Sequence, residues 1–456
     1  MPTEERTTFL PDVSAQQLWD WHQRPGAFER LLPPWAHMRV VDALPALEEG
    51  AMARFELARF GLRLSWQARH HDVTPGSGFT DTQVRGPFRR WVHTHRFEDA
   101  PGGANLHDRI DWDLPLPPLG RWVAGASIRR ELSQMLHFRH QRTADDLSFH
   151  QRFAAQPRLR VGITGASGLV GTALSAFLTT GGHTVVSFSR RAAPGRAILW
   201  RPTEGVLDPA SLNDLDAIIH LAGEPIAGGR WNPDRKRRIR DSRVLGTALI
   251  AEAIAACERP PPVFISASAV GIYGHRDEPV DEASPPGDGF LAEVGTAWEA
   301  AADPARRAGV RVVHPRISVV LDGTGGALPK MLPPFRLGLG GPLGSGAQGH
   351  PWIALEDLVR LLATMLHRDD MVGPYNACTP TPISQAAFAR ALGAALNRPA
   401  FIPAPAFAVR LLLGEMADAV LLHGAHVVPT RTLDAGFSWK HPDAEAAIRY
   451  VLGRGS

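Results

Sequence analysis

The sequence of 456 residues contains few residues of three kinds, namely two cysteines, three tyrosines and three lysines. The cysteines, Cys257 and Cys378, are too few for a disulfide framework and too far apart for a zinc knuckle. A long apolar run is also missing, because acidic and arginine side chains interrupt the most apolar late stretch, residues 406–424. The first ten residues are polar and acidic, unlike a signal peptide. These absences predict a cytoplasmic protein without a membrane span.

An excess of charge of one sign is missing as well. Lys and Arg total 49 against 46 Asp and Glu, a formal net charge of +3. A nucleic-acid-binding protein usually has a strong basic excess, so we expect no nucleic-acid partner. Apolar residues make up 44% of the chain and charged residues 21%, which is typical of globular proteins. A chain of 456 residues is too long for one ordinary core, and we therefore expect two or three domains.

Residues 1–152 have the pattern of an α+β domain. Five alternating runs between residues 51 and 114 are separated by Gly, Pro and Asp turns, which favours antiparallel strands. Ser14 is a candidate N-cap for a helix near the start, and a long amphipathic helix is expected over about 119–146. The simplest assembly is a curved sheet that grips this last helix, and such folds usually enclose a cavity.

Two histidines of this region share one face of a strand. His93 and His95 are two residues apart, and side chains along a strand alternate between its faces. One interpretation is a ligand-lining or metal-lining face, and the other is an ordinary strand with two hydrogen-bonded histidines. His137 and His140, three residues apart on the last helix, allow the same two interpretations. No carboxylate completes a recognisable metal-ligand spacing, and we therefore expect no metal site.

A different pattern begins near residue 158. An apolar strand is followed at once by Gly165, Gly168 and Gly171 and then by a helix. Glycines at this spacing allow a tight turn and close approach of the backbone to a pyrophosphate at the helix N-terminus, so we expect a dinucleotide site. Strands continue to alternate with helices, which predicts a doubly wound parallel sheet over 158–380, followed by a small C-terminal domain over 381–456.

The end of the second strand of this region discriminates between cofactors. An NAD site places an acidic residue there, whereas this sequence has Ser189, Arg190 and Arg191. Arginine can bind a 2′-phosphate in a bidentate manner, so we predict NADP(H), with two surface arginines in a loop as the alternative. The basic run over 230–243 is either a solvated helix face or a contact to an anionic ligand through Arg230 or Arg243.

The residues expected to contact the cofactor lie at the ends of successive strands. They are Gly165, Ser167, Gly168, Leu169, Val170 and Gly171; Ser189, Arg190 and Arg191; Leu221, Ala222, Gly223 and Glu224; and Ser266 and Arg316. Residues 322–349 are rich in glycine and are expected to form a long loop that covers the substrate side. Lys330 and Gln348 are the polar candidates within this loop.

Two parts of the chain resemble known families. Residues 158–453 resemble the extended short-chain dehydrogenase/reductase superfamily. Within it they resemble the atypical branch of epimerase family proteins, which is related to cell-division-inhibitor-like proteins. Residues 5–150 resemble the START-like polyketide cyclase family. The segments that carry the resemblances are 164–168, 220–225, 327–335 and 373–376 for the first, and 78–83, 86–91 and 138–140 for the second. They imply that a helix-grip domain comes first in the chain and a Rossmann domain follows it. The helix-grip domain would hold a hydrophobic ligand.

The superfamily resemblance also implies proton transfer by a Tyr-x-x-x-Lys pair beside a serine. No such pair exists in this sequence, and Phe290 and Val294 stand in its place. Ser268 matches the serine, and Tyr273 is the candidate displaced acid/base unless its ring only packs at the strand end. We therefore predict an NADP(H)-binding oxidoreductase or epimerase acting on a small-molecule substrate. The alternative is a catalytically silent NADP(H)-binding sensor or scaffold with a lipid pocket in its N-terminal domain.

Overall fold

The chain forms two compact units in the computed structural model. The structure describes residues 2–36, 38–41, 47–59, 62–115, 119–193, 195 and 197–455. The first unit runs to Gln156 and the second from Pro157 to Arg454, except that residues 176–182 are grouped with the first. The expected division into three domains, at residues 152, 158 and 381, stays a prediction.

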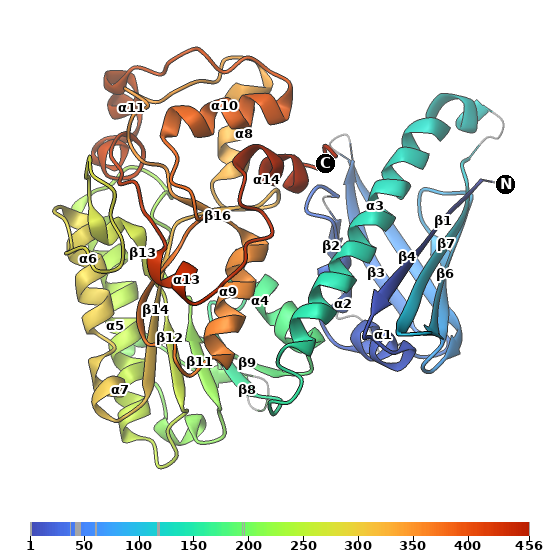
Figure 1. Ribbon diagram of the computed structural model, residues 1–456, viewed down its shortest axis with the longest axis horizontal. Coiled ribbons are helices and arrows are strands. Elements are labelled where there is room, and N and C mark those ends of the chain that lie inside the picture. The colour runs from blue at the N-terminus through green and yellow to red at the C-terminus, as the bar shows by residue number, and fades with distance from the viewer. Residues whose placement is uncertain are drawn as a thin grey trace. The chain divides into compact units, whose positions relative to one another are not determined.

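The first unit is a seven-stranded antiparallel sheet with one long helix (Figure 1). The strand order is β1-β7-β6-β5-β4-β3-β2. Leu132 and Leu136 of helix α3 share a buried core cluster with Trp91 and Trp112 of the sheet, which is the predicted helix-grip arrangement. The elements are β1 (Thr3–Pro11), α1 (Ala15–Gln23), α2 (Ala27–Leu31), β2 (Met38–Val40), β3 (Met52–Arg59), β4 (Leu62–Thr74), β5 (Gly78–Arg85), β6 (Arg90–Ala100), β7 (Gly103–Asp113) and α3 (Leu119–Gln151).

The N-terminal end of this unit holds one confirmed and one missed prediction. Ser14 caps helix α1 as predicted, since its hydroxyl accepts from the amide of Gln17 while the Gln17 side chain accepts from the Ser14 amide. Strand β1 is not predicted by the sequence pattern. Its residues are polar on both faces, and only Leu10 is buried. Pairing with β7 along the full length of β1, from Thr3 to Pro11, therefore defines this edge strand.

The second unit contains a parallel sheet of the expected doubly wound kind (Figure 1). Its strand order is β10-β9-β8-β11-β12-β14, with β13 and β17 both paired to β14. Strands β8 and β11 lie next to each other at the place where the order reverses, which is where open α/β sheets bind their ligands. The strands are β8 (Arg160–Thr164), β9 (Thr184–Ser189), β10 (Ala197–Leu199), β11 (Ala217–His220), β12 (Val263–Ser266), β13 (Ser268–Ala269), β14 (Arg311–Ile317) and β17 (Gly373–Ala377).

Helices cover both faces of this sheet, with α5 and α7 on one side and α4 and α9 on the other in Figure 1. Ile250 and Ile254 of α5 pack in one buried cluster with Phe264 of β12. The helices are α4 (Leu169–Thr180), α5 (Pro233–Ala256), α6 (Phe290–Ala300), α7 (Asp303–Arg307), α9 (Leu355–His367), α10 (Gln385–Leu396), α11 (Ala406–Leu413), α12 (Glu415–Ala417), α13 (Thr430–Asp434) and α14 (Ala444–Val451). Short 3-10 helices at Pro202–Glu204, Pro209–Leu212 and Val270–Tyr273, a π-helical turn at Asp418–Leu422, and the pair β15 (Val319–Leu321) and β16 (Trp352–Ala354) complete the unit.

The segment 322–349 is not the continuous loop that its glycine content suggests. Helix α8 (Leu328–Arg336) interrupts it. Leu328, Leu332 and Phe335 lie on one face of this helix and are buried in the core cluster that also holds α10 and α14. Apolar residues at this spacing therefore outweigh the two internal prolines, Pro333 and Pro334. The prolines stand in the last turn of the helix, and because neither has an N–H each leaves one carbonyl of the preceding turn without its intrahelical partner.

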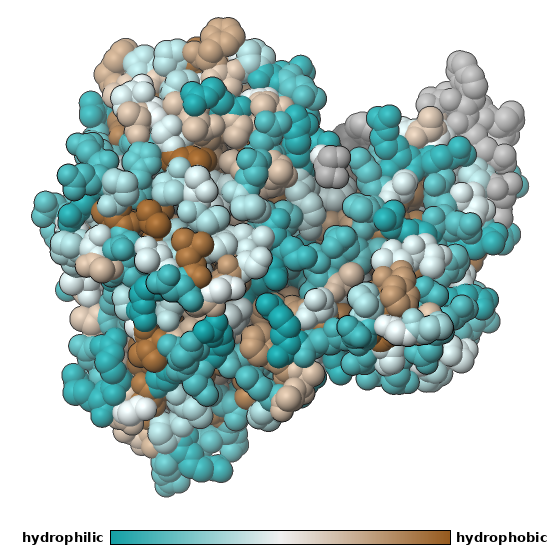
Figure 2. Space-filling view, in the orientation of Figure 1, coloured by the Kyte–Doolittle hydropathy of each residue, from teal (hydrophilic) through white to brown (hydrophobic). Residues whose placement is uncertain are grey.

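Among the residues that the structure describes, no helix is both long enough and apolar enough to span a membrane. Hydrophilic residues cover most of the face shown in Figure 2, and hydrophobic residues form small separate patches on it. The largest exposed apolar side chains belong mainly to α11 and to the chain before it, and they include Phe401, Phe407, Leu411 and Leu412. Helix α11 therefore exposes apolar side chains, with only Val409 buried.

Candidate cofactor and substrate site

The glycine turn between β8 and α4 has the geometry that its residues predict. Gly165 has a φ of +69°, and a Cβ there would lie 3.0 Å from the amide nitrogen of Ala222. A Cβ on Gly171 would lie 2.1 Å from the carbonyl oxygen of Gly165. The turn therefore packs so closely on itself and on the end of β11 that glycine is required at both positions. Helix α4 begins at Leu169, so its N-terminus stands at the place expected for a pyrophosphate.

A buried hydrogen-bond network holds the end of β11 against this turn. Thr164 Oγ1 accepts hydrogen bonds from the amides of Leu221 and Ala222, over 3.1 and 3.2 Å. The threonine hydroxyl therefore donates its proton to His220 Nδ1, 2.7 Å away. Burial and the nearby charge of Arg243 lower the pKa of His220 to about 3. His220 is thus neutral with its proton on Nε2, and the backbone of residues 221–222 is fixed beside the expected cofactor site.

Arg243 supports the loop that follows. Its guanidinium donates to the carbonyl oxygens of Glu224 and Ile239 over 3.1 and 3.0 Å, and burial lowers its pKa to about 10. A Cβ on Gly223 would lie 3.3 Å from the guanidinium carbon. In the same basic run Arg237 is 66% and Arg240 58% exposed, whereas Arg235 is 12% exposed and donates to the carbonyl oxygen of Pro225. Most of the run is thus a solvated helix face, whereas Arg243 is buried and stabilises the loop after β11.

The arginines at the end of β9 are exposed and free for an anion. Arg190 accepts at its carbonyl oxygen from Arg201, and the Arg191 amide donates to Ser189 Oγ over 3.1 Å. Within the described part of the chain, neither guanidinium has a hydrogen-bond or ion-pair partner. The sequence from 187 to 191 contains no carboxylate. The position that selects the ribose substituent in a Rossmann fold is therefore positively charged here.

The two candidate catalytic residues belong to one buried network. Ser268 Oγ donates to Glu299 Oε1 over 2.7 Å, and Arg316 binds the same carboxylate in a bidentate manner over 2.8 and 2.9 Å. Arg316 also donates to the Tyr273 hydroxyl over 2.8 Å, and that hydroxyl donates to Asn376 Oδ1 over 2.8 Å. Sequence reasoning missed Glu299 and Asn376 as members of this network. Glu299 stands in no recognisable motif, and Asn376 ends the segment 373–376 but meets Tyr273 only through the fold.

This network constrains what its members can do. Tyr273 is fully buried, and burial raises its pKa to about 12. Arg316 and Ser268 hold the pKa of Glu299 below its usual value despite burial. The guanidinium of Arg316, expected to contact the cofactor, is committed to Glu299 and Tyr273. Ser266 Oγ is buried without a hydrogen-bond partner among the described residues, and its contact with the cofactor stays a prediction.

A lysine and aromatic rings occupy the place of the missing tyrosine. Phe290 begins α6, and the ammonium of Lys236 lies 4.7 Å from the centre of its ring. The same ammonium donates to Glu415 Oε1 over 2.7 Å. Trp231 packs edge-on against Phe290 at a centroid distance of 5.2 Å. Val294, where the lysine of the pair would stand, is only 4% exposed, so this place is aromatic and apolar with one cation above it.

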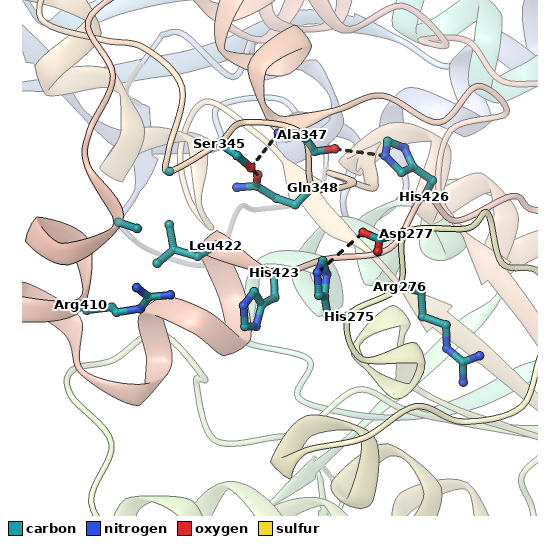
Figure 3. Close-up of a pocket in the computed structure, with 12 residues that line it drawn as sticks. His275, Arg276, Asp277, Ser345, Ala347, Gln348, Arg410, Leu422, His423 and His426 are labelled. Atoms are coloured by element: carbon teal, nitrogen blue, oxygen red, sulfur yellow. Dashed lines mark hydrogen bonds and ion pairs between the residues drawn. The ribbon is translucent and has the colours of Figure 1, made fainter.

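A polar cavity of about 310 Å³ opens directly after Tyr273 in the chain (Figure 3). It is bordered by the segment 275–277, the segment 344–348 and the region from α11 to His426. His275 and His423 stack at a centroid distance of 4.6 Å. Arg410 pairs with Asp418, and the Arg276 guanidinium points away from the other lining side chains (Figure 3) and donates to the carbonyl oxygens of Pro285 and Pro286. Gln348, a predicted polar candidate, lines the cavity but donates to the carbonyl oxygens of Leu343 and Leu421. Lys330, the other one, lies elsewhere and donates to Ala227.

Family models match three consecutive parts of the chain. The polyketide cyclase / dehydrase and lipid transport family matches residues 11–139, and the NAD dependent epimerase/dehydratase family matches residues 161–378. A domain of unknown function matches residues 404–451. An epimerase family protein of Mycobacterium bovis is 42% identical over 296 residues, which are 64% of this chain and 98% of the relative.

Two solved structures agree with these matches. A nucleoside-diphosphate sugar epimerase of Corynebacterium glutamicum is similar over 99% of this chain and 90% of its own, with a TM-score of 0.81 and 33% identity. Human epimerase family protein SDR39U1, solved with NADPH, is similar over 65% of this chain and 99% of its own, with a TM-score of 0.59 and 38% identity.

The second unit is thus a Rossmann-type short-chain dehydrogenase/reductase module, and the first is a START-like domain of the polyketide cyclase type. The chain belongs to the NAD dependent epimerase/dehydratase family, and its relatives carry the name epimerase family protein. The predicted fold class and both family resemblances are confirmed.

Proposed function

We propose that this chain is an NADP(H)-dependent oxidoreductase or epimerase with a small-molecule substrate. The observation that carries the proposal is the pair of unpaired guanidinium groups, Arg190 and Arg191, at the end of β9, next to a glycine turn at the point where the strand order reverses. A 2′-phosphate fits this charge, and the related human structure was solved with NADPH. When bound, the cofactor would exchange a hydride with the substrate.

The substrate class to test first is a nucleoside-diphosphate sugar, the class in the name of the Corynebacterium relative. The cavity after Tyr273 supports this choice, because three histidines line it while Asp277 is the only acidic residue that lines it among the described residues. The imidazoles would donate to a diphosphate, whereas Arg276 is committed to backbone carbonyl oxygens and Arg410 is paired with Asp418. Ser268 and Tyr273 stay the proposed catalytic pair, with Ser268 orienting the reacting oxygen and Tyr273 transferring a proton.

A silent cofactor-binding protein is the second candidate function. The observation that favours it is the state of Tyr273, which is fully buried and has a pKa of about 12 without a lysine to lower it. A general base works best with a pKa near the operating pH. In this case NADP(H) binding would change the interactions of the protein and not lead to turnover.

The first unit and the cellular location complete the proposal. The match to a family described by lipid transport supports a hydrophobic ligand on the concave side of the first sheet, where Phe55, Trp66 and Trp91 belong to one buried aromatic cluster. A cytoplasmic location is supported by the two cysteines, neither of which forms a disulfide.

Cofactor binding and turnover test the proposal in sequence. Titration with NADPH, followed by its fluorescence, is expected to saturate at lower concentration than titration with NADH. No NADPH response would reject both candidate functions. Oxidation of NADPH, or epimerisation of a nucleoside-diphosphate sugar in its presence, would establish the enzyme. The variants Ser268→Ala and Tyr273→Phe are then expected to lower kcat about 100-fold or more, whereas Tyr375→Phe, a tyrosine outside the network, serves as control. Equal kcat in all variants would reject the catalytic assignment.

A further inference from the structure

The inner face of the first sheet contains a buried cluster of histidines and carboxylates that the proposed function does not use. In the antiparallel register Asp81 of β5 stands opposite His93 of β6, and His95 of β6 stands opposite Asp108 of β7. Directly opposed residues point to the same face. His93 and His95 are 3% and 1% exposed, and their ring centres are 4.0 Å apart. Three strands thus bring two imidazoles and two carboxylates into one buried place.

The Nε2 atoms of the two histidines lie too far from the carboxylates for ordinary hydrogen bonds. His95 Nε2 lies 3.5 Å from Asp81 Oδ2, a separation that suits two ligands of one ion, and His93 Nε2 lies 3.6 Å from Asp108 Oδ1. Both Nε2 atoms are buried without a hydrogen-bond partner among the described residues. Two ligand atoms bound at about 2.0–2.1 Å to a tetrahedral ion stand about 3.3–3.5 Å apart. One ligand atom each from Asp81, His93 and His95 lies within 4.8 Å of those of the other two.

The surroundings of these three residues match the outer shell of a metal site. Ligating histidines usually donate their second nitrogen to a carboxylate, and ligating carboxylates are themselves hydrogen-bonded. His95 Nδ1 lies 2.6 Å from Asp108 Oδ1, and His70 Nδ1 contacts Asp81 Oδ1. His140 Nε2 lies 3.2 Å from the other oxygen of Asp108 and holds it in place.

The negative charge of the cluster and its access to solvent also favour a bound cation. Asp81 and Asp108 carry two negative charges, and Arg139 is near enough for its charge to interact with both. A bound divalent cation would be stabilised by this negative charge. The Asp81 carboxylate is 20% exposed, so an ion can enter from that side. Phe79 stacks on His95 at a centroid distance of 4.2 Å and gives the site an apolar wall.

We propose that Asp81, His93 and His95 bind a divalent transition-metal ion on the inner face of the first sheet. Two imidazoles and one carboxylate suit Zn²⁺ or Fe²⁺ and leave coordination positions open for a further ligand. His95 binds through Nε2, with Asp108 as the partner of its Nδ1. The proposal concerns the first unit and is independent of the cofactor site of the second.

Metal analysis of the full-length chain tests this site. The tag-free protein is stripped with a chelator, dialysed against Zn²⁺ or, without oxygen, Fe²⁺, desalted and measured by mass spectrometry of the metal. We expect about one ion per chain. Loading with Co²⁺ is expected to give visible d–d absorption bands of an imidazole- and carboxylate-bound ion.

Variants locate the ion. Asp81→Asn keeps the size of the side chain and a hydrogen bond to His70, so it preserves the fold while removing a charged ligand. We expect Asp81→Asn and His93→Gln to lose the bound metal, and Asp108→Asn to weaken affinity about 10–100-fold. The matched control is His107→Gln, because His107 neighbours Asp108 on β7 but contacts Thr7 outside the cluster. Circular dichroism of each variant checks folding.

Two results would overturn the proposal. If the wild-type chain retains neither Zn²⁺, Co²⁺ nor Fe²⁺ after desalting, a water molecule or a proton on His95 occupies the cluster. If Asp81→Asn and His93→Gln retain the metal with unchanged Co²⁺ absorption, the ion binds elsewhere.

Discussion

The hydroxyl of Thr164 donates a hydrogen bond to Nδ1 of His220 over 2.7 Å, between the two neighbouring strands at which the strand order reverses. The same oxygen accepts the amides of Leu221 and Ala222. One side chain thus couples the glycine turn after β8 to the loop after β11. Removing its hydroxyl leaves the part-buried amide of Ala222 and one imidazole nitrogen without this partner, whereas the Leu221 amide keeps the carbonyl oxygen of Thr164.

Thr164→Val tests this coupling. Valine keeps the shape of the side chain but can bond neither His220 Nδ1 nor the Ala222 amide, and we expect a loss of about 1–3 kcal/mol in the free energy of unfolding. NADPH affinity is expected to fall as well, because the loop at 221–222 is no longer fixed. Urea unfolding and NADPH titration measure the two effects. Thr164→Ser keeps the hydroxyl and is the control; equal losses in both variants would show that the hydroxyl is not the cause.

His220 predicts a pH dependence of stability. Its pKa is about 3 in the folded chain and 6.5 in the unfolded one. Between these values the unfolded state binds more protons, so stability falls as pH decreases below 6.5 and the loss ends below about 3. At pH 5 the protonation of His220 in the unfolded state lowers the free energy of unfolding by about 2 kcal/mol. His220→Asn keeps an acceptor for Thr164 and does not titrate.

Urea unfolding at pH 7.5 and pH 5 checks this expectation. The difference in stability between the two pH values is expected to be about 2 kcal/mol smaller in His220→Asn than in the wild type. Other buried histidines, such as His350 with a pKa lowered to about 4 by burial, give the wild type and the variant the same background. Parallel pH profiles of the two proteins would contradict a neutral His220.

Two glycines of the turn, Gly168 and Gly171, are expected to differ in the stability lost when each is replaced by alanine. A Cβ on Gly171 would overlap the carbonyl oxygen of Gly165 at 2.1 Å, whereas a Cβ on Gly168 would meet the same oxygen at 3.2 Å. Gly171→Ala is therefore expected to cost about 1–3 kcal/mol in unfolding free energy, and Gly168→Ala much less. Thermal unfolding without cofactor compares them. A larger loss in Gly168→Ala would contradict the described turn.

The arginines after β9 predict cofactor preference. We expect Arg190→Ala, and the double variant with Arg191→Ala, to raise the Kd for NADPH about 10–100-fold. NADH affinity is expected to stay unchanged, since NADH has no 2′-phosphate. Arg259→Ala, at an exposed arginine paired with Asp214, is the control for a change of net charge. A parallel loss of both cofactors would mean that these arginines do not recognise the 2′-phosphate.

The sequence predicts the parts of the fold in which local pattern and burial agree. Strand β8, the turn at Gly165 and helix α4 follow from apolar runs and glycine spacing, because the central strands of a parallel sheet are buried on both faces. Strand β1 and helix α8 do not follow. The first is an edge strand with polar residues on both faces, and Pro333 and Pro334 mask the apolar spacing of the second.

The candidate sites could be predicted only where one segment supplies the chemistry. Arg190 and Ser268 stand at strand ends that the sequence reveals. The partners of Ser268 and Tyr273, namely Glu299, Arg316 and Asn376, come from three further elements. Asp81 likewise joins His93 through the register of two strands, and register depends on pairing across the sheet. The expectation of no metal site rests on spacing along the chain, which cannot include a carboxylate from a neighbouring strand, and it stays a prediction.

The side chain of Val294 makes a tyrosine–lysine pair hard to build into this chain. The pair needs two substitutions, one at Phe290 and one at Val294, and the second would place an ammonium group where only 4% of the present side chain is exposed. A lysine there without its tyrosine would be a buried unpaired charge, which is strongly destabilising. A designer who wants the pair in this core therefore has no stable single-substitution intermediate through Val294, and a redesigned active site is better built around the residues now present.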